Sequence, residues 1–176
     1  MNRNRTIGFA LAALIFVADQ AMKAFVVEGL GLAYPGASKE ILPFFDLRFV
    51  ANIGVSLGLL PADTPTMRWL LVALTAAIAA GVAWWMAREK SRPDMFALAL
   101  VLGGALGNIV DRVRFGYVVD YADLHFGEWR PFLVFNVADA AITIGVVILL
   151  VRALFVRDKQ KADANADAAP VENANA

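Results

Sequence analysis

Two aspartates, Asp120 and Asp139, have the residue type and placement that suit acid–base chemistry. Two carboxylates brought close together do not both ionise cheaply, so such a pair retains one proton. One member can then take a proton from water while the other donates one, which is what hydrolysis of a peptide bond requires. A loop aspartate and an acid favoured by the dipole at a helix start would also explain the two residues. Position alone leaves these interpretations open.

The composition removes most other chemistries. The chain has no cysteine, which excludes disulfides, thiolate catalysis and cysteine-based zinc sites. Its single histidine, His125, excludes a multi-histidine metal site formed by this chain alone. The net charge is zero and no basic patch with interleaved aromatic residues occurs, so nothing indicates nucleic-acid binding. We expect neither a metal nor another cofactor.

Charged residues within apolar stretches form a second group of candidates. Asp19 and Lys23 lie four residues apart, hence on one face of a helix. Either a structural ion pair or a role in handling a substrate would explain them. For Asp111 and Arg112 a structural role is favoured, because an arginine can brace loop carbonyls and a carboxylate together.

Amides and glycines complete the set of polar and small candidates. Asn52 and Asn136 could satisfy backbone groups at the ends of a loop or a helix. Asn108 shares a helical face with the two charged residues that follow it. Gly103 and Gly107 have the small-xxx-small spacing that is typical of close helix packing.

Four apolar stretches must position these side chains. The chain is 60% hydrophobic and 18% charged with a mean hydropathy of +0.61, so a bilayer is its natural solvent. Each stretch approaches the roughly 20 residues that cross the hydrocarbon core. The spans are expected at about 7–27, 69–87, 95–113 and 137–156. The first is too long for a cleavable signal peptide and is broken by Asp19, Gln20 and Lys23, so we expect it to be retained.

The distribution of Lys and Arg predicts the orientation in the membrane. Eight basic residues fall on one side: Arg3, Arg5, Arg88, Lys90, Arg92, Arg157, Lys159 and Lys161. Five fall on the other: Lys39, Arg48, Arg68, Arg114 and Arg130. The positive-inside rule therefore places both termini in the cytoplasm and both longer loops outside.

The outer loops are expected to carry structure of their own. Residues 45–49 alternate strictly between apolar and charged, the pattern of a half-exposed strand. The second outer loop, 115–135, is expected to be partly helical, with Phe126, Trp129 and Phe132 at the interface. The predicted fold is an all-α integral membrane protein of four spans with a small β element on its outer face. Its domain covers 1–157, and the Ala-, Asp- and Asn-rich stretch 158–176 is expected to be a disordered cytoplasmic tail.

Three motifs in fixed order resemble a known family. Residues 103–112 read Gly-Gly-Ala-Leu-Gly-Asn-Ile-Val-Asp-Arg, 118–121 read Val-Val-Asp-Tyr, and 135–139 read Phe-Asn-Val-Ala-Asp. Their order and spacing resemble the signature of the lipoprotein signal peptidases, also called signal peptidase II. Asp19-Gln20 with Lys23, and 52–54 (Asn-Ile-Gly), are similar to that family's earlier motifs. The resemblance covers roughly residues 5–157.

The resemblance implies an aspartic endopeptidase of the bacterial cytoplasmic (inner) membrane. Such enzymes remove signal peptides from prolipoproteins, cutting just before a cysteine that already carries a diacylglyceryl group. By motif, the catalytic pair falls on Asp120 and Asp139. The supporting or substrate-binding positions implied are Asp19, Lys23, Asn52, Gly54, Gly104, Asn108, Asp111, Arg112, Asn136 and Ala138. Expected partners are the lipidated prolipoprotein and membrane lipid, with the enzyme a monomer and its site near the outer face.

One departure and three alternatives accompany the resemblance. Residues 55–57 read Val-Ser-Leu where the family commonly has Ala-Ala-Phe or a near variant. Residues 54–58 match the Gly-x-Ser-x-Gly nucleophile elbow, which has meaning only on a strand-to-helix turn of an α/β sheet. A Ser56–Lys23 dyad is chemically possible but leaves the carboxylates unexplained. A transporter is disfavoured, because the charges gather at one interface instead of crossing the membrane.

Overall fold

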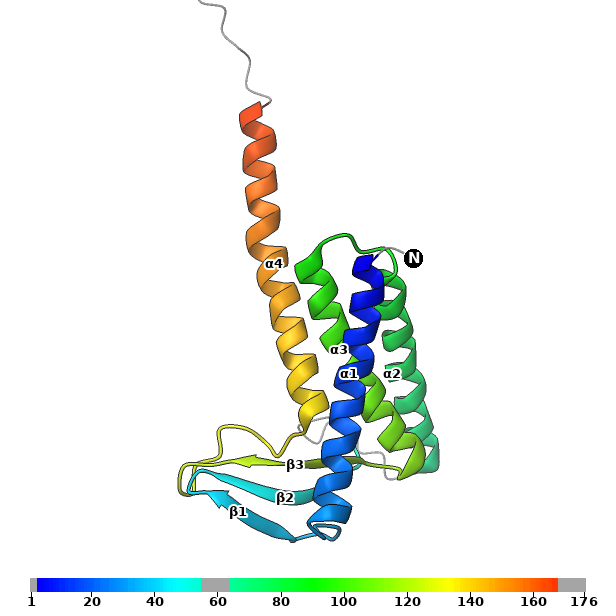
Figure 1. Cartoon of the computed structure of the whole chain (residues 1–176), viewed down its shortest axis with the longest axis vertical. Coiled ribbons are helices and arrows are strands. Elements are labelled where there is room, and N and C mark those ends of the chain that lie inside the picture. Colours follow the sequence, from blue (N-terminus) through cyan, green and yellow to red (C-terminus); the bar gives the residue numbers. More distant parts are fainter. Residues whose placement is uncertain (1–2, 55–63, 168–176) are drawn as a thin grey trace, which may run out of the picture.

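Four long helices and one small sheet make up the described part of the chain. The computed structural model describes residues 3–54 and 64–167. Helix α1 (Arg3–Ala24) continues into a π-helical segment, η1 (Phe25–Gly29), and is followed by α2 (Pro65–Met86), α3 (Arg92–Arg114) and α4 (Val137–Asp167) (Figure 1). All four helices are long and apolar enough to cross a membrane. The predicted four spans are therefore confirmed.

Local capping sets the starts of α2 and α3, a few residues before the apolar stretches begin. Thr64 accepts a hydrogen bond from the backbone N–H of Met67, and Pro65 occupies the first turn of α2. Ser91 does the same for Asp94 at the start of α3. These side chains satisfy N–H groups that have no partner within the helix, so each helix begins where its cap stands.

Helix α3 lies at the centre of the bundle and packs against each of the other three helices. Its residues 97–104 are buried without interruption. Glycines allow the close approach: a Cβ atom at Gly103 would lie 2.5 Å from the Ala12 carbonyl oxygen of α1. A Cβ atom at Gly104 would lie 2.5 Å from the Ala138 carbonyl oxygen of α4. A Cβ atom at Gly107 would press on the Asp19 carboxylate of α1. The predicted close packing at Gly103 and Gly107 is therefore present.

The sheet has three antiparallel strands in the order β1 (Ser38–Leu42), β2 (Phe45–Asn52) and β3 (Val118–Leu124). The predicted strand at 45–49 is confirmed as part of β2. The partly helical second loop is wrong: this segment supplies β3, and residues 125–136 contain no helix. Pairing with β2 satisfies one edge of its backbone, and Phe135 exchanges backbone hydrogen bonds with the other edge at Ala122. All but the last of its residues are buried, so the segment is covered on both faces.

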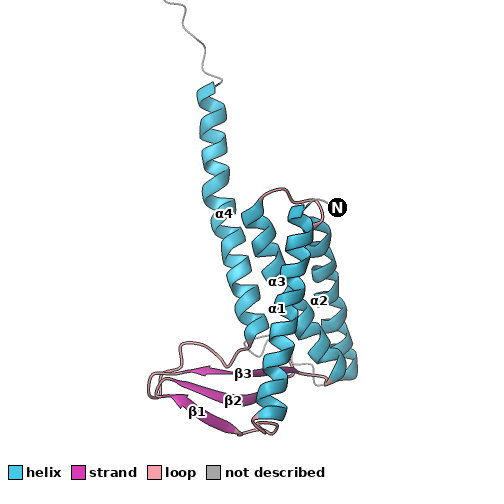
Figure 2. Ribbon diagram, viewed as in Figure 1, coloured by secondary structure: helices cyan, strands magenta, loops and turns pink. Residues whose placement is uncertain are grey.

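The sheet crosses one end of the bundle, while the start of α1 and the C-terminal part of α4 lie at the opposite end (Figures 1 and 2). Residues Val26, Leu47, Phe49, Val119 and Tyr121 belong to one buried cluster that joins η1 to the sheet. Helix α4 continues to Asp167, into the first part of the stretch 158–176. Residues 168–176 lie outside the described part of the chain.

Candidate active site

Asp139 lies in the first turn of α4 and takes part in a reciprocal cap with Asn136. The Asn136 side-chain oxygen accepts a hydrogen bond from the Asp139 backbone N–H at 2.8 Å. Asp139 Oδ2 accepts one from the Asn136 backbone N–H at 3.2 Å. This capping-box arrangement fixes the Asp139 carboxyl relative to the helix start. Its other oxygen, Oδ1, accepts a hydrogen bond from Asn108 Nδ2 at 2.8 Å.

Asp120 lies on β3 opposite Val50 of β2, with only 2% of its surface exposed. Asn52 Nδ2, at the end of β2, donates to Asp120 Oδ2 at 3.0 Å, and Asn136 Nδ2 donates to Asp120 Oδ1 at 2.7 Å. Burial, as the larger cause, and the nearby charge of Asp139 together raise the pKa of Asp120 to about 7. The carboxyl therefore holds a proton close to neutral pH.

Asn136 links the two aspartates directly. Its side-chain amide donates to Asp120, while its backbone N–H and side-chain oxygen bind Asp139. Asn136 is 1% exposed, so water does not compete for these contacts. Asp120 of β3 and Asp139 of α4 are thus both bound by Asn136. The charge of Asp139 is close enough to raise the pKa of Asp120.

A buried lysine lies behind the aspartates. Lys23 Nζ is 2.8 Å from Asp19 Oδ2, 2.8 Å from Asp111 Oδ2 and 3.2 Å from the side-chain oxygen of Asn108. These contacts use the three donors of the ammonium group. Because Lys23 binds the Asn108 oxygen, the amide nitrogen of Asn108 is turned toward Asp139. The ion cluster thereby orients a hydrogen bond to one member of the pair.

The same cluster, formed by side chains of α1 and α3, also binds the backbones of α4 and β3. Asp19 Oδ1 accepts a hydrogen bond from the Ala138 backbone N–H at 2.9 Å, which satisfies a free donor in the first turn of α4. Asp111 Oδ2 accepts one from the Val119 backbone N–H of β3 at 3.1 Å. The Asp19–Lys23 ion pair, one of the two explanations that the sequence left open, is present, and it ties the starts of the elements that carry Asp139 and Asp120.

Arg112 braces the loop that follows β2, in line with the structural role that its residue type favoured. Its Nη2 donates to the Gly54 carbonyl oxygen at 2.8 Å. Gly54 in turn donates its backbone N–H to the side-chain oxygen of Asn52 at 3.1 Å, which sets the amide nitrogen of Asn52 toward Asp120. Residues 55–57, where the sequence departs from the family pattern, and Ser56 of the alternative dyad lie outside the described residues.

Gly104 of α3 and Ala138 of α4 lie in contact where the two helices pack together. Ala138 is fully buried, and its carbonyl oxygen fills the space that a side chain at position 104 would need. The structure therefore brings all twelve residues of the predicted site into one region. Among the described residues, no group of three or more acidic or histidine side chains is arranged to hold a metal ion.

Two further residues belong to this region, and neither was among the predicted site residues. Gln20 Nε2 donates to Asp111 Oδ1 at 2.9 Å, which adds to the ion cluster. Arg68 of α2 donates to the carbonyl oxygens of Arg112 and Val113 at 2.8 and 2.7 Å, and so closes the end of α3. An amide beside the Asp19 motif and an arginine in the first turn of an apolar helix are weak signals, because both residue types are common near membrane surfaces.

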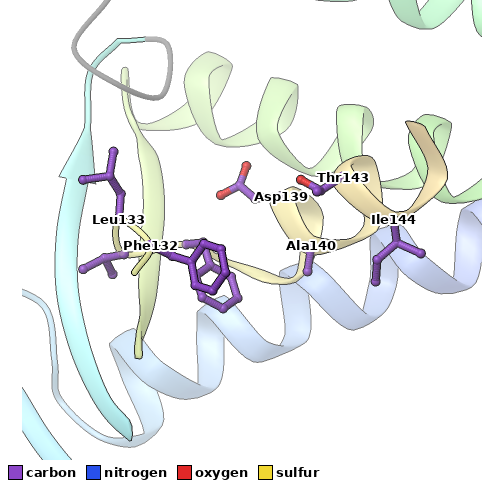
Figure 3. A pocket seen from close by; sticks show the side chains of 8 residues that line it. Phe132, Leu133, Asp139, Ala140, Thr143 and Ile144 are labelled. Carbon is purple, nitrogen blue, oxygen red and sulfur yellow. The ribbon is translucent and has the colours of Figure 1, made fainter. Parts of the chain in front are cut away.

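A pocket of about 300 Å³ opens beside Asp139. Figure 3 shows its lining, in which the Asp139 carboxyl is the acidic group among mainly apolar side chains. The loop before α4 supplies Phe132 and Leu133, and α4 supplies Ala140, Thr143 and Ile144. Phe132, Leu133 and Ile144 are each more than half exposed, as expected of a cleft that an apolar chain could enter.

The comparisons with known proteins agree with this architecture. The family described as "Signal peptidase (SPase) II" matches residues 11–155. Proteins named "Lipoprotein signal peptidase" from Rhizorhabdus wittichii and Sphingopyxis alaskensis are 54% and 53% identical, covering 94% and 93% of this chain and 95% and 92% of theirs. A solved "Bacterial membrane enzyme structure by the in meso method at 2.3 A resolution" has a TM-score of 0.75 at 25% identity and covers 95% of each chain. The chain belongs to the signal peptidase II family, the lipoprotein signal peptidases.

Proposed function

We propose that the chain is an aspartic endopeptidase of the bacterial inner membrane that cuts diacylglyceryl-modified prolipoproteins immediately before the lipidated cysteine. Family membership makes it a protease that removes signal peptides from lipoproteins. The observation that carries the finer proposal is the joint binding of Asp120 and Asp139 by Asn136 at the edge of an apolar pocket. This arrangement supports a carboxyl dyad that faces a hydrophobic substrate.

In the proposed reaction the dyad shares one proton. The ionised carboxylate takes a proton from water as the water oxygen attacks the scissile carbonyl carbon. The protonated carboxyl donates to the carbonyl oxygen, and a tetrahedral intermediate forms. The carbon–nitrogen bond then breaks, and the cysteine nitrogen leaves with a proton. The products are a signal peptide with a free carboxylate and a lipoprotein whose amino-terminal residue is the lipidated cysteine.

The supporting residues hold this pair and its surroundings. Asn52 and Asn136 donate to Asp120, and Asn108 donates to Asp139, so each carboxyl keeps a fixed direction. Arg112 holds the Gly54 loop beside them. Fixed direction is what acid–base catalysis needs, because a proton is transferred only within hydrogen-bond reach.

The pocket beside Asp139 supports entry of the substrate from the membrane. A signal peptide is an apolar helix, and the lipid on its cysteine would keep the scissile bond at membrane height. The apolar side chains Phe132, Leu133 and Ile144 would contact this segment. We further propose that the enzyme acts as a monomer, with both termini cytoplasmic and the dyad near the outer face.

A serine–lysine mechanism is less well supported. Lys23 Nζ is held between Asp19 and Asp111, and an ammonium group between two carboxylates is poorly placed to accept a proton from Ser56. A serine-directed acylating inhibitor should therefore leave the activity unchanged.

The test is cleavage of a purified prolipoprotein, with and without its diacylglyceryl group, followed by mass spectrometry of the released peptide. The full chain should cut only the lipidated form. Asp120→Asn and Asp139→Asn should each lower the rate by about a thousandfold, since each removes an acid–base group. Glu40→Gln, at an exposed position of β1, is the charge-matched control and should keep full activity. A fully active Asp139→Asn enzyme would refute the dyad.

A further inference from the structure

A second pocket lies between α1 and α3, at the end of the bundle opposite the sheet. It encloses about 260 Å³. Its lining includes Arg3, Ile7 and Leu11 of α1 and Arg92 and Phe96 of α3. This α1–α3 pocket is separate from the aspartate pair, which lies where α4 begins beside the sheet (Figure 1). Neither the dyad nor its supporting residues explain it.

The lining changes from charged to apolar along the pocket. Arg3 and Arg92 stand at the first residues of α1 and α3, which both begin at this end. One turn further along, Ile7 and Phe96 are apolar and 55% and 47% exposed. Leu11 continues the apolar wall by another turn of α1. A ligand that fits this order has an anionic end and a hydrocarbon end.

The two arginines have no acidic partner in the described part of the chain, and the neighbouring acids are already engaged. Asp94 binds Arg152 Nε at 2.5 Å and Arg152 Nη2 at 3.2 Å. Glu89 accepts hydrogen bonds from the Trp85 ring nitrogen and from the backbone N–H of Ser91. The positive charge at the mouth of the pocket is therefore not neutralised by these side chains, and it favours an anion from outside the chain.

We propose that the α1–α3 pocket binds one anionic phospholipid, with its phosphate between Arg3 and Arg92 and an acyl chain along Ile7, Leu11 and Phe96. The planar guanidinium group pairs well with phosphate oxygens. Basic pockets between spanning helices are known sites for acidic headgroups. The lipid would cover apolar side chains that the protein leaves exposed. This site does not depend on the proposed dyad, because it can be emptied while the cleavage site is intact.

The experiment measures lipid retained by the purified full chain by native mass spectrometry, after exchange into detergent with limiting phosphatidylglycerol or phosphatidylcholine. The wild type should retain one phosphatidylglycerol in preference to phosphatidylcholine. Arg3→Gln combined with Arg92→Gln should weaken retention about thirtyfold, from the loss of two cationic contacts. The matched control is Arg88→Gln, because that guanidinium lies 4.0 Å over the Trp84 ring and does not line the pocket.

Two further measurements distinguish a bound lipid from free phosphate and check that the variants still fold. Arg3→Lys with Arg92→Lys should retain most of the lipid, and both double variants should still cleave prolipoprotein in detergent. Inorganic phosphate at millimolar concentration should not displace the lipid, because it lacks the acyl chain. Equal retention of the two lipids, unchanged retention by the glutamine double variant, or displacement by phosphate alone would overturn the proposal.

Discussion

The side chain of Asp120 combines strong burial with a charged neighbour, and this predicts how activity depends on pH. Its pKa is raised to about 7 by burial first and by Asp139 second. When the pH rises through this value the dyad loses its shared proton and with it the general acid. We expect kcat/KM to decrease as the pH rises above about 7. The apparent pKa of this decrease describes the coupled pair and not one residue alone. A rate that stays flat from pH 6 to 9 would contradict this.

The same shift has a consequence for folding that can be measured without substrate. Between the ordinary carboxyl value and about pH 7 the native state binds more protons at Asp120 than the unfolded chain does, so stability falls as pH rises. Asp120→Asn removes this titration. The Tm of the variant minus that of the wild type should grow from pH 5 to about 7 and level off above. Glu40→Gln, which replaces an exposed carboxyl on β1, is the control and is measured over the same pH range.

At the level of residues, the sequence predicted which side chains gather but not how they bond. Charged and amide residues were recognised because such groups are costly in apolar stretches. The double role of Asn136 was not predictable, since it needs the start of α4 to lie against β3. The use of Asp19 to hold the first turn of α4 likewise depends on packing between segments far apart in the chain.

At the level of elements, the contact of α3 with α4 sets the position of Asp139. A methyl group at Gly104 would press on the Ala138 carbonyl oxygen, and rigid backbone has little room to yield. Gly104→Ala should therefore push α4 away and lower stability by about 1–3 kcal/mol. It should also lower the cleavage rate, because α4 carries one of the proposed catalytic acids. The measurements are thermal unfolding in detergent and the lipoprotein cleavage assay.

Gly81→Ala is the matched control for this change. Gly81 lies in an exposed turn of α2, where an added Cβ meets no atom within 4 Å. Its replacement should be neutral or stabilising by up to about 1 kcal/mol, since alanine favours a helix. If Gly104→Ala matched this control in both Tm and rate, the close approach of α3 and α4 would have no part in placing the site.

The elements also differ in how far the sequence could predict them. Hydropathy was sufficient for the four spans. Strict alternation was sufficient for residues 45–49 of β2, where exposed Arg48 lies between buried Leu47 and Phe49. Strand β3 was missed because almost all of its residues are buried and no alternation appears. The sequence predicted starts for α2 and α3 that lie a few residues after the observed ones, because capping side chains and not hydropathy determine where these helices begin.

At the level of the whole molecule, the sheet lies at one end of the bundle, and the start of α1 and the C-terminal part of α4 lie at the other (Figure 2). Asn52 lies on β2 and Asp120 on the neighbouring strand β3, while Lys39 lies on β1 of the same sheet. Any label that locates Lys39 relative to the membrane therefore also locates the proposed dyad. Lys90, in the connection between α2 and α3, marks the other end.

The absence of cysteine makes this orientation directly measurable, since a single introduced thiol is the sole site of labelling. Lys39→Cys and Lys90→Cys replace two exposed side chains. In spheroplasts, a membrane-impermeant maleimide should label Lys39→Cys at once and Lys90→Cys only after the membrane is opened, because the basic side is retained in the cytoplasm. The unaltered chain should take no label. The reverse pattern would place the dyad on the cytoplasmic side, where a signal peptide's cleavage site would not reach it.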